Sequence, residues 1–582
     1  MCLSAAAQNS VSTATIDSTN AQIPSTDTVF TMPVHKTLAD WEKRKTQLRK
    51  QILNAAGLYP LPARQPMRSL VFGRIEHKDY SIEKVALETM PGYWLGANLY
   101  RPVGKGPRRP AIVSPHGHWV YGRLEHQQLA SVPARGITLA KLGFVVLSYD
   151  MVGFNDTMQT PHAFGDDRRD QLWSFGPLGL QLWNSIRAVD FLTQLADVDP
   201  DRIGATGASG GATQILMLAA VDDRIRFSAP VNMISSIMQG GSPCENAPGL
   251  RIGTNNMEIG AMMAPRPMLM ISATGDWTRN TPNVEFPAVR SIYELYDARV
   301  RLETRQIDAP HNYNLESREA VYRFFARTVL HAPNPEQIKE GGVRIEKLSD
   351  MLVWHGRTLP DAALDFAGVR RSWIEMGKAQ TNAAEGKPDL EKERLALTLS
   401  AEWPSEVKSA PGTQADSGYL SRTNEARRIA YLILGSGAPT HLVVGEAGID
   451  SALGSQEVQQ LRKQGESVLL IGAFNTGSAK STRDVSERHF LTFNKSDDAE
   501  RVQDILTAIR WMQQRGATHI RVSGLQKAAV WATYAAAVAP VRVQLTSRPV
   551  FEDSEDGFAR DFFVPGILRA GGWKLAVRLA GL

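Results

Sequence analysis

Cysteine is nearly missing from this chain of 582 residues, which holds only Cys2 and Cys244. Two cysteines exclude both a disulfide framework and a cysteine-rich zinc site. Basic side chains are not concentrated either, because 65 lysines and arginines are scattered among 60 aspartates and glutamates, for a net charge of +5. Without a basic patch or stripe, the sequence predicts no nucleic-acid partner.

Long apolar runs are also absent, and none reaches the roughly 20 residues that a helix needs to cross a bilayer. We therefore expect no transmembrane segment. Residues 1–35 are rich in serine, threonine and alanine and lack the basic start and apolar block of a signal peptide. They predict a flexible leader. If an export signal was removed upstream, the protein is periplasmic or extracellular, and Cys2 is the candidate for a lipid-anchored cysteine.

What the chain does have is a regular alternation of strand and helix patterns. Residues 80–90 and 93–102 indicate an antiparallel strand pair, whereas the nearly continuous apolar segments 109–119 and 143–153 indicate parallel strands buried on both faces. A long amphipathic helix is expected over 178–198. This alternation predicts an α/β fold built on a doubly wound, mostly parallel sheet.

The length and the pattern divide the chain into two large domains. We expect the first domain over 36–340, a linker and irregular segment over 341–399, and the second domain over 400–582. The second domain repeats the first in weaker form, since "SIRAVDFLTQLADVDPDRIGATGASGGA" is echoed by "ILTAIRWMQQRGATHIRVSGLQKAA". The sequence thus predicts a second, incomplete α/β domain of the same kind.

A serine flanked by glycines lies in the stretch "DRIGATGASGGATQ", where Ser209 follows a strand-prone segment and precedes an apolar helix. A sharp strand-to-helix turn at this place lifts the serine Oγ above the sheet edge, and Gly207 and Gly211 allow the close backbone crossing. The G-x-S-x-G pattern is common, and a plain glycine-rich turn is the alternative. Its position between strand and helix favours a nucleophile at Ser209.

A serine nucleophile needs a histidine to take its proton and a carboxylate to orient that histidine. Asp276 follows a buried strand in "MLMISATGDWT", at the sheet edge where such an acid belongs. Asp308 and Glu258 are its rivals. Asp308 is only three residues from His311 and is expected to shape that loop, and Glu258 comes before the expected strand. Asp276 is therefore the predicted acid.

The predicted base is His311 in "RQIDAPHNYN", in a loop between a strand and the last helix of the first domain. A hydrogen-bonded loop histidine is the alternative, and His331 competes less well because it falls after that helix. Ser209, Asp276 and His311 then follow one another in the order serine, acid, histidine.

The oxyanion of such a reaction needs two N–H donors. Gly210 begins the helix after the serine, and Gly117 in "VSPHGHWVYG" permits a turn that presents the N–H of His118 or Trp119. His116 and His118 form an H-x-H pair, for which a metal site is the alternative. Metal-dependent hydrolases need further clustered ligands, and no second pair is evident, so we expect neither a metal nor a cofactor.

These motifs, with "QGGSPCENAPGLR", "APRPMLMISATGDWTRNTP" and "DAPHNYNLESREAVYRFF", resemble the acetyl xylan esterase-like branch of the α/β-hydrolase superfamily, related to dienelactone hydrolase and cephalosporin C deacetylase. The resemblance covers about residues 70–330. It implies that Ser209, Asp276 and His311 form a catalytic triad, with Gly210 and the region of His118 as the oxyanion hole.

The same resemblance places the loop "GGSPCENAPG" near the pocket mouth, with Glu245 pinning the loop, and His116 is a further candidate pocket residue. It implies an exported serine esterase that removes small acyl groups, acetyl above all, from carbohydrate. Fold alone does not set the substrate. A methyl or glucuronoyl esterase acting on uronic acids and a non-catalytic carbohydrate-binding scaffold are the alternatives, and a peptidase is disfavoured by the lack of β-propeller repeats. The sequence does not set the oligomeric state.

The second domain lacks the three catalytic residues. Gln526 stands where the serine is expected, and Lys527 and Ala528 replace the two following glycines, which is expected to compromise the turn. The sequence also ends before an acid-bearing strand and a histidine loop come into view. We therefore predict a degenerate, catalytically inactive α/β-hydrolase-like domain.

Overall fold

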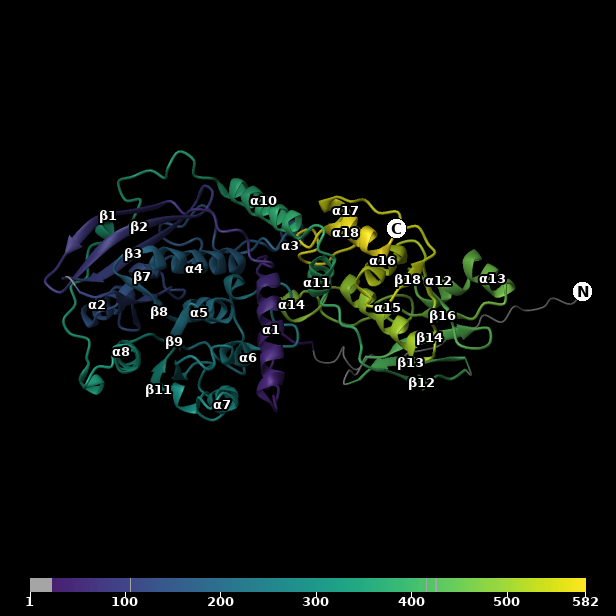
Figure 1. Ribbon diagram of the computed structural model, residues 1–582, viewed down its shortest axis with the longest axis horizontal. Helices are drawn as coiled ribbons and strands as arrows, with labels where there is room; N and C mark the ends of the chain where they lie inside the picture. The colour runs from purple at the N-terminus through teal and green to yellow at the C-terminus, as the bar shows by residue number, and fades with distance from the viewer. Residues whose placement is uncertain (1–22, 105, 415, 424–426) are drawn as a thin grey trace, which may run out of the picture. The chain divides into compact units, whose positions relative to one another are not determined.

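The computed structural model describes residues 23–104, 106–414, 416–423 and 427–582, which leaves Cys2 outside the described part (Figure 1). The described chain forms two compact units. The first unit holds Ser25–Asp170 and Ser174–Gln380, and the second unit holds Gln171–Trp173 and Thr381–Leu582. In the described part, no helix is both long enough and apolar enough to cross a membrane.

The first unit is built on a nine-stranded sheet in the order β1-β2-β3-β7-β4-β8-β9-β10-β11 (Figure 1). β1 to β3 and β7 pair antiparallel, and the strands from β7 to β11 pair parallel. The strands are β1 (Ser69–Glu76), β2 (Tyr80–Met90), β3 (Tyr93–Pro102), β4 (Arg109–Val113), β7 (Val145–Tyr149), β8 (Val198–Ala208), β9 (Ile225–Val231), β10 (Met268–Gly275) and β11 (Leu302–Pro310), with a separate hairpin of β5 (His126–Gln127) and β6 (Ala130–Ser131).

Helices cover both faces of this sheet. One face carries the core formed with α2 and α8, and the other carries the larger core formed with α1, α4, α5, α6 and α7. The central strands β4 and β7 bury side chains on both faces, as their continuous apolar sequence predicts. The helices are α1 (Leu38–Ala55), α2 (Val132–Leu142), α3 (Arg168–Leu172), α4 (Pro177–Gln194), α5 (Gly210–Val221), α6 (Asn256–Ala261), α7 (Glu285–Leu295), α8 (Leu315–Thr328), α9 (Leu348–Met351) and α10 (Phe366–Ala384).

This layering confirms the predicted doubly wound α/β fold, which is that of the α/β hydrolases. Two details differ from the sequence prediction. Residues 341–399 are not irregular, because they contain α9, α10 and α11 (Pro388–Thr398). Part of the expected leader is packed on the first unit, since the Thr26 hydroxyl donates to the Gly240 carbonyl at 2.6 Å and the Phe30 amide donates to the Ser236 carbonyl at 2.8 Å.

The second unit has a seven-stranded sheet in the order β12-β13-β14-β16-β15-β17-β18. The first three strands and β16 pair antiparallel, and β16, β15, β17 and β18 pair parallel. The strands are β12 (Val407–Pro411), β13 (Ser417–Arg422), β14 (Ile429–Leu434), β15 (His441–Val444), β16 (Val468–Ile471), β17 (Ile520–Gly524) and β18 (Val543–Leu545).

Helices also cover both faces of the second sheet, with α12 and α13 on one face and α15 and α16 on the other. Besides α11, the helices of this unit are α12 (Ile449–Leu453), α13 (Gln456–Lys463), α14 (Phe490–Phe493), α15 (Asp497–Gln514), α16 (Ala528–Val538), α17 (Glu555–Asp561) and α18 (Gly572–Ala580).

The second sheet reproduces the first seven strands of the nine-stranded sheet, in the same spatial order and the same directions. In both sheets three antiparallel strands are followed by a crossover, so that β16 and β15 occupy the places of β7 and β4. β17 and β18 correspond to β8 and β9. Within the described residues, no strand of the second unit corresponds to β10 or β11. The predicted internal repeat is therefore a repeat of topology, and its sheet is the shorter one.

His441, at the start of β15, makes the stability of the second unit depend on pH. Its Nε2–H donates to the Ser523 hydroxyl at 2.8 Å, and burial lowers the pKa of His441 to about 4. In the unfolded chain this histidine has an ordinary pKa of about 6.5. Between about pH 6.5 and pH 4 it is therefore protonated in the unfolded chain and neutral in the folded unit. As the pH falls from about 6.5 to about 4, His441 therefore contributes a loss of stability to this unit. Asp504 of the same unit, whose pKa burial raises to about 7, contributes the opposite change.

By calorimetry, we expect acidification over this pH range to be less favourable for the melting temperature of the wild-type second unit than for that of His441→Gln. The matched change His519→Gln, at an exposed histidine, should leave the wild-type pH dependence intact. Equal pH dependence in the two variants would contradict the assignment.

Candidate active site

Ser209 occupies the turn between β8 and α5, with φ +57° and ψ −128°. A non-glycine residue adopts this conformation only when its surroundings impose it. A Cβ on Gly207 would lie 2.7 Å from the backbone of Gly211, so the strand and the helix cross too closely for any side chain there. The Ser209 amide donates to the Val231 carbonyl at the end of β9, at 3.1 Å. The structure thus has the sharp turn that the motif predicts, with a partly exposed serine at its tip.

Asp276 and His311 follow the neighbouring strands β10 and β11 and lie in contact. The Nδ1–H of His311 donates to Oδ2 of Asp276 at 2.7 Å. The other carboxylate oxygen, Oδ1, accepts the amide of Thr278 at 2.7 Å and its hydroxyl at 2.6 Å. The Asp276 side chain is 2% exposed and that of His311 is 24% exposed. The carboxylate is therefore held in one orientation and fixes the histidine with Nε2 directed away from it.

Nε2 of His311 is buried and has no hydrogen-bond partner among the residues that the structure describes. It does not bond the Ser209 hydroxyl in this conformation. Catalytic hydrogen bonds are often long until substrate binds. An imidazole with Nδ1 bonded to a carboxylate and Nε2 left open has the arrangement of a general base.

Two hydrogen bonds join the loop of His311 to the region of the Ser209 turn. Asn232, next to the Val231 carbonyl that accepts the Ser209 amide, donates from its side chain to the Asn312 carbonyl at 3.1 Å. The Tyr313 hydroxyl bonds the Thr206 hydroxyl of β8 at 2.6 Å.

The rings of Trp277 and Trp119 lie 4.3 Å and 6.1 Å from the His311 ring, between centroids. Trp119 in turn lies near the turn, since a Cβ on Gly117 would be 3.1 Å from its Nε1 and 3.2 Å from Cβ of Ser209. The two loops thus share one neighbourhood above the sheet edge.

The rival acids are engaged elsewhere. Asp308 is exposed and accepts the Thr274 hydroxyl at 2.7 Å. Glu258 is buried and pairs with Arg44 at 2.8 Å. Neither partner belongs to the loop of His311.

The three candidate donors to the oxyanion differ in whether their amide N–H is already bonded. Gly210 is the first residue of α5, next to Ser209, and its Cα faces His118, because a Cβ there would be 2.5 Å from Cε1 of that ring. The amide of Trp119 donates to the Gly117 carbonyl at 2.8 Å, so this N–H is already used inside the loop. Gly210 and His118 remain the better candidates for amide donors.

His116 has both ring nitrogens bonded to the backbone, so it offers no free nitrogen for the metal site that was the alternative for the H-x-H pair. It is fully buried, its Nε2 accepts the Met151 amide at 2.9 Å, and its Nδ1–H donates to the Gly117 carbonyl at 2.6 Å. Burial lowers the pKa of His116 to about 3, so the ring is neutral. Its role is to hold the loop after β4.

Glu245 pins its own loop, as expected. It is buried, and Oε2 accepts the amides of Gly241 and Ser242 at 2.8 and 2.9 Å. Sequence reasoning did not single out Thr278 or Asn232, which orient the acid and the histidine loop. An Asp-x-Thr turn, in which the carboxylate accepts from the residue two positions on, is the signal that points to Thr278.

The second unit keeps the turn but not the serine. Gln526 has φ +57°, as Ser209 has, and a Cβ on Gly524 would lie 2.3 Å from the Ala528 carbonyl oxygen. The expectation that the turn is compromised is therefore wrong, because Gly524 alone preserves the close crossing. The amide of Lys527, at the place of Gly210, is 3.4 Å from the Glu446 carboxylate. A carboxylate thus sits where an oxyanion would be received.

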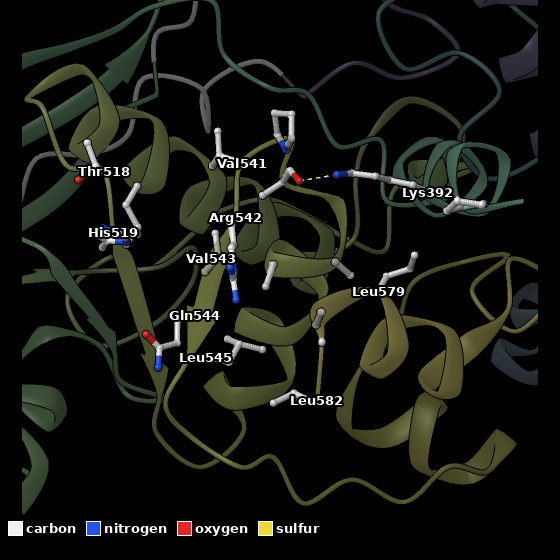
Figure 2. A pocket seen from close by; sticks show the side chains of 18 of the residues that line it. Lys392, Thr518, His519, Val541, Arg542, Val543, Gln544, Leu545, Leu579 and Leu582 are labelled. Atoms are coloured by element: carbon white, nitrogen blue, oxygen red, sulfur yellow. Dashed lines mark hydrogen bonds between the residues drawn. The ribbon is translucent and has the colours of Figure 1, made fainter. Parts of the chain in front are cut away.

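A pocket of about 1040 Å³ lies elsewhere in the second unit, beside the edge strand β18 (Figure 2). Its ionisable lining residues are Asp389, Lys392, His519 and Arg542. Lys392 donates to the Ala539 carbonyl, and Gln526 is not among the lining residues. This hollow brings together no serine, acid and histidine.

Comparisons with known proteins find a hydrolase, a transferase and an esterase among the proteins similar to this chain. No known family profile matches it. YtaP of Bacillus subtilis (strain 168), a protein named as a hydrolase, is 28% identical over 256 residues, which are 41% of this chain and 83% of YtaP. Polyketide transferase claH of Penicillium crustosum is 31% identical over 152 residues, 26% of this chain and 44% of claH.

Among solved structures, Methylesterase BT1017 has 29% sequence identity and a TM-score of 0.51, over 59% of this chain and 78% of that protein. These similarities confirm the resemblance to the esterases of the α/β-hydrolase superfamily that the motifs predicted.

The bond between Tyr313 and Thr206 offers a test of how firmly the two loops are joined. Tyr313→Phe removes a buried hydrogen bond but keeps the ring under the Arg135 guanidinium, 4.6 Å from its centroid. We expect the variant to lose about 1 kcal/mol of unfolding free energy in urea titrations. The control Tyr121→Phe, at a tyrosine that is 54% exposed, should change little. Equal stability of the two variants would show that the bond does not hold the loop.

Proposed function

We propose that this chain, an α/β hydrolase of the esterase branch, is a serine carboxylic-ester hydrolase acting on esterified carbohydrate. The observation that supports this best is the bond between His311 and Asp276, held beside a strained turn that carries Ser209. Similarity to YtaP and to Methylesterase BT1017 supports ester hydrolysis in general. The carbohydrate is part of the proposal and comes from the sequence motifs.

In the proposed reaction, Nε2 of His311 takes the Ser209 proton as Oγ attacks the ester carbonyl. The amides of Gly210 and His118 receive the negative charge on the carbonyl oxygen. Collapse of the tetrahedral intermediate expels the alcohol, which takes the proton from His311, and leaves an acyl-serine. Water, deprotonated by His311, then releases the carboxylic acid and restores the serine. The Asp276 carboxylate, bonded to Nδ1, stabilises the imidazolium that forms. The serine chemistry requires no cofactor.

Two ester classes fit this machinery. Removal of acetyl groups from sugar hydroxyls is what the sequence motifs favour. Cleavage of a methyl ester on a uronic acid is favoured by the likeness to a structure named as a methylesterase. Assays of the purified protein on acetylated, methyl-esterified and glucuronoyl-esterified polysaccharides distinguish these substrates. The released products are acetate from the first, methanol from the second, and the alcohol esterified to the glucuronic acid from the third. No turnover of any ester would leave the non-catalytic scaffold as the function.

Ser209→Ala should lower kcat by several orders of magnitude, because only oxyanion and binding effects remain without the nucleophile. The control Ser291→Ala, at an exposed serine of α7, should leave kcat unchanged. Retention of more than about a tenth of wild-type activity, a barrier change below roughly 1.4 kcal/mol, would reject Ser209 as the nucleophile.

We further propose that the second unit is catalytically inactive. Gln526→Ser should create no activity, because the described part of the second unit has no strands equivalent to β10 and β11 to carry an acid and a histidine, and a serine without a base stays protonated. The change is best measured in the Ser209→Ala background, where the rate should stay at that of the single variant. A rate of ester hydrolysis in the double variant above that of Ser209→Ala, or labelling of residue 526 by a serine-reactive probe, would contradict the proposal.

A further inference from the structure

Three side chains outside the proposed triad meet beside the start of α5. Nε2 of His118 lies 3.1 Å from Nε2 of His162 and 3.1 Å from Sγ of Cys244. All three ligand atoms lie within 4.8 Å of one another. His118 follows β4, His162 lies in the loop after β7, and Cys244 lies in a short 3₁₀ helix, Pro243–Glu245, after β9. Three distant parts of the first unit therefore aim nitrogen and sulfur atoms at one point.

We propose that His118, His162 and Cys244 form a binding site for a zinc-type divalent cation. Two imidazoles and a thiolate are a donor set that Zn²⁺ favours over the oxygen ligands that Mg²⁺ and Ca²⁺ select. In tetrahedral zinc sites, with Zn–N bonds of about 2.0–2.1 Å and Zn–S bonds of about 2.3 Å, ligand atoms lie roughly 3.3–3.6 Å apart. The two separations from His118 Nε2 are 3.1 Å, slightly short of that range, and the third is at most 4.8 Å, so small rotations of the side chains bring the ligand atoms into place.

The rings and the thiol are held by groups that behave like the outer ligands of a metal site. Nδ1–H of His162 donates to the Val152 carbonyl at 2.7 Å. A carbonyl only accepts, so the proton is on Nδ1 and the lone pair of Nε2 points to the cluster.

Cys244 is 2% exposed, and its helix is closed by a capping box between Ser242 and Glu245. The carbonyl of Glu245 also accepts from Arg251 at 2.9 Å. The sulfur therefore has little freedom to turn away from His118.

The position of the cluster links it to the turn of Ser209. His118 packs against Gly210, the residue that follows the serine, closely enough that a Cβ on Gly210 would lie 2.5 Å from Cε1 of the ring. Three protein ligands leave a fourth position in a tetrahedral site, which catalytic zinc centres give to water or to the substrate. A cation here would offer its open position to an oxygen of a molecule bound at the serine.

The sequence concealed this site. Its H-x-H pair suggested a metal through His116 and His118, but the structure buries His116 in bonds to the backbone. The true companions of His118 are 44 and 126 residues away along the chain, and no spacing rule connects them. The metal-free alternative is a hydrogen-bonded cluster in which His118 donates to His162.

Zinc binding by the full-length protein tests the site. The protein is treated with a chelator, dialysed, and titrated with ZnCl₂ against a chromophoric competitor. We expect one equivalent to bind per chain. Cys244→Ser and His162→Asn should each weaken binding by roughly 100-fold or more, beyond the 10–100-fold typical of losing an outer partner. The control His331→Ala, at an exposed histidine, should bind as the wild type does.

Cobalt provides a readout of the ligands themselves. Co²⁺ should give the wild type and His331→Ala a near-ultraviolet thiolate charge-transfer band that Cys244→Ser lacks, with circular dichroism confirming that each variant is folded. Absence of zinc binding by the wild type overturns the proposal, and so does equal binding by Cys244→Ser and His162→Asn. Either result identifies the cluster as hydrogen-bonded only.

Discussion

A single residue with positive φ, between a parallel strand and the helix that follows it, is the constraint around which both units are arranged. It forces the helix to leave the strand so sharply that the residue two positions earlier must be glycine, as Gly207 and Gly524 are. Such a conformation costs about 1–3 kcal/mol and persists only when the packing around it supplies the energy. The buried helices α5 and α16 and the parallel strands beneath them provide that packing in their own units.

In the proposed function, the same turn serves chemistry in the first unit and only architecture in the second. In the first unit, β10 and β11 extend the sheet beyond β9, and Asp276 and His311 lie at the carboxyl ends of these strands, where their hydrogen bond forms. In the described part of the second unit the sheet stops at β18, so neither partner has a strand to carry it. Gln526 keeps the strained backbone, but its amide side chain cannot lose a proton and act as a nucleophile as a serine hydroxyl can. Fold and catalytic potential are thus separable within one chain.

The sequence predicted the features that depend on local pattern. Strand-to-helix turns, buried parallel strands and the order of Ser209, Asp276 and His311 follow from periodicity and motif, and the structure brings the last two into contact. It did not predict β1, because an exposed edge strand has little apolar alternation. The helices within 341–399 were missed because their polar surfaces resemble a linker. The meeting of His118 with Cys244 depends on tertiary folding, which no spacing within the sequence reveals.

The central claim is that Ser209 is activated by His311 and that Gln526 marks an inactive copy of the same turn. Mass spectrometry of the full-length protein after reaction with a fluorophosphonate tests it most directly, since only an activated serine attacks phosphorus. The account predicts one adduct per chain, on the peptide that contains Ser209, and loss of that adduct in His311→Ala. An unmodified Ser209, or an adduct that forms equally without His311, would contradict it.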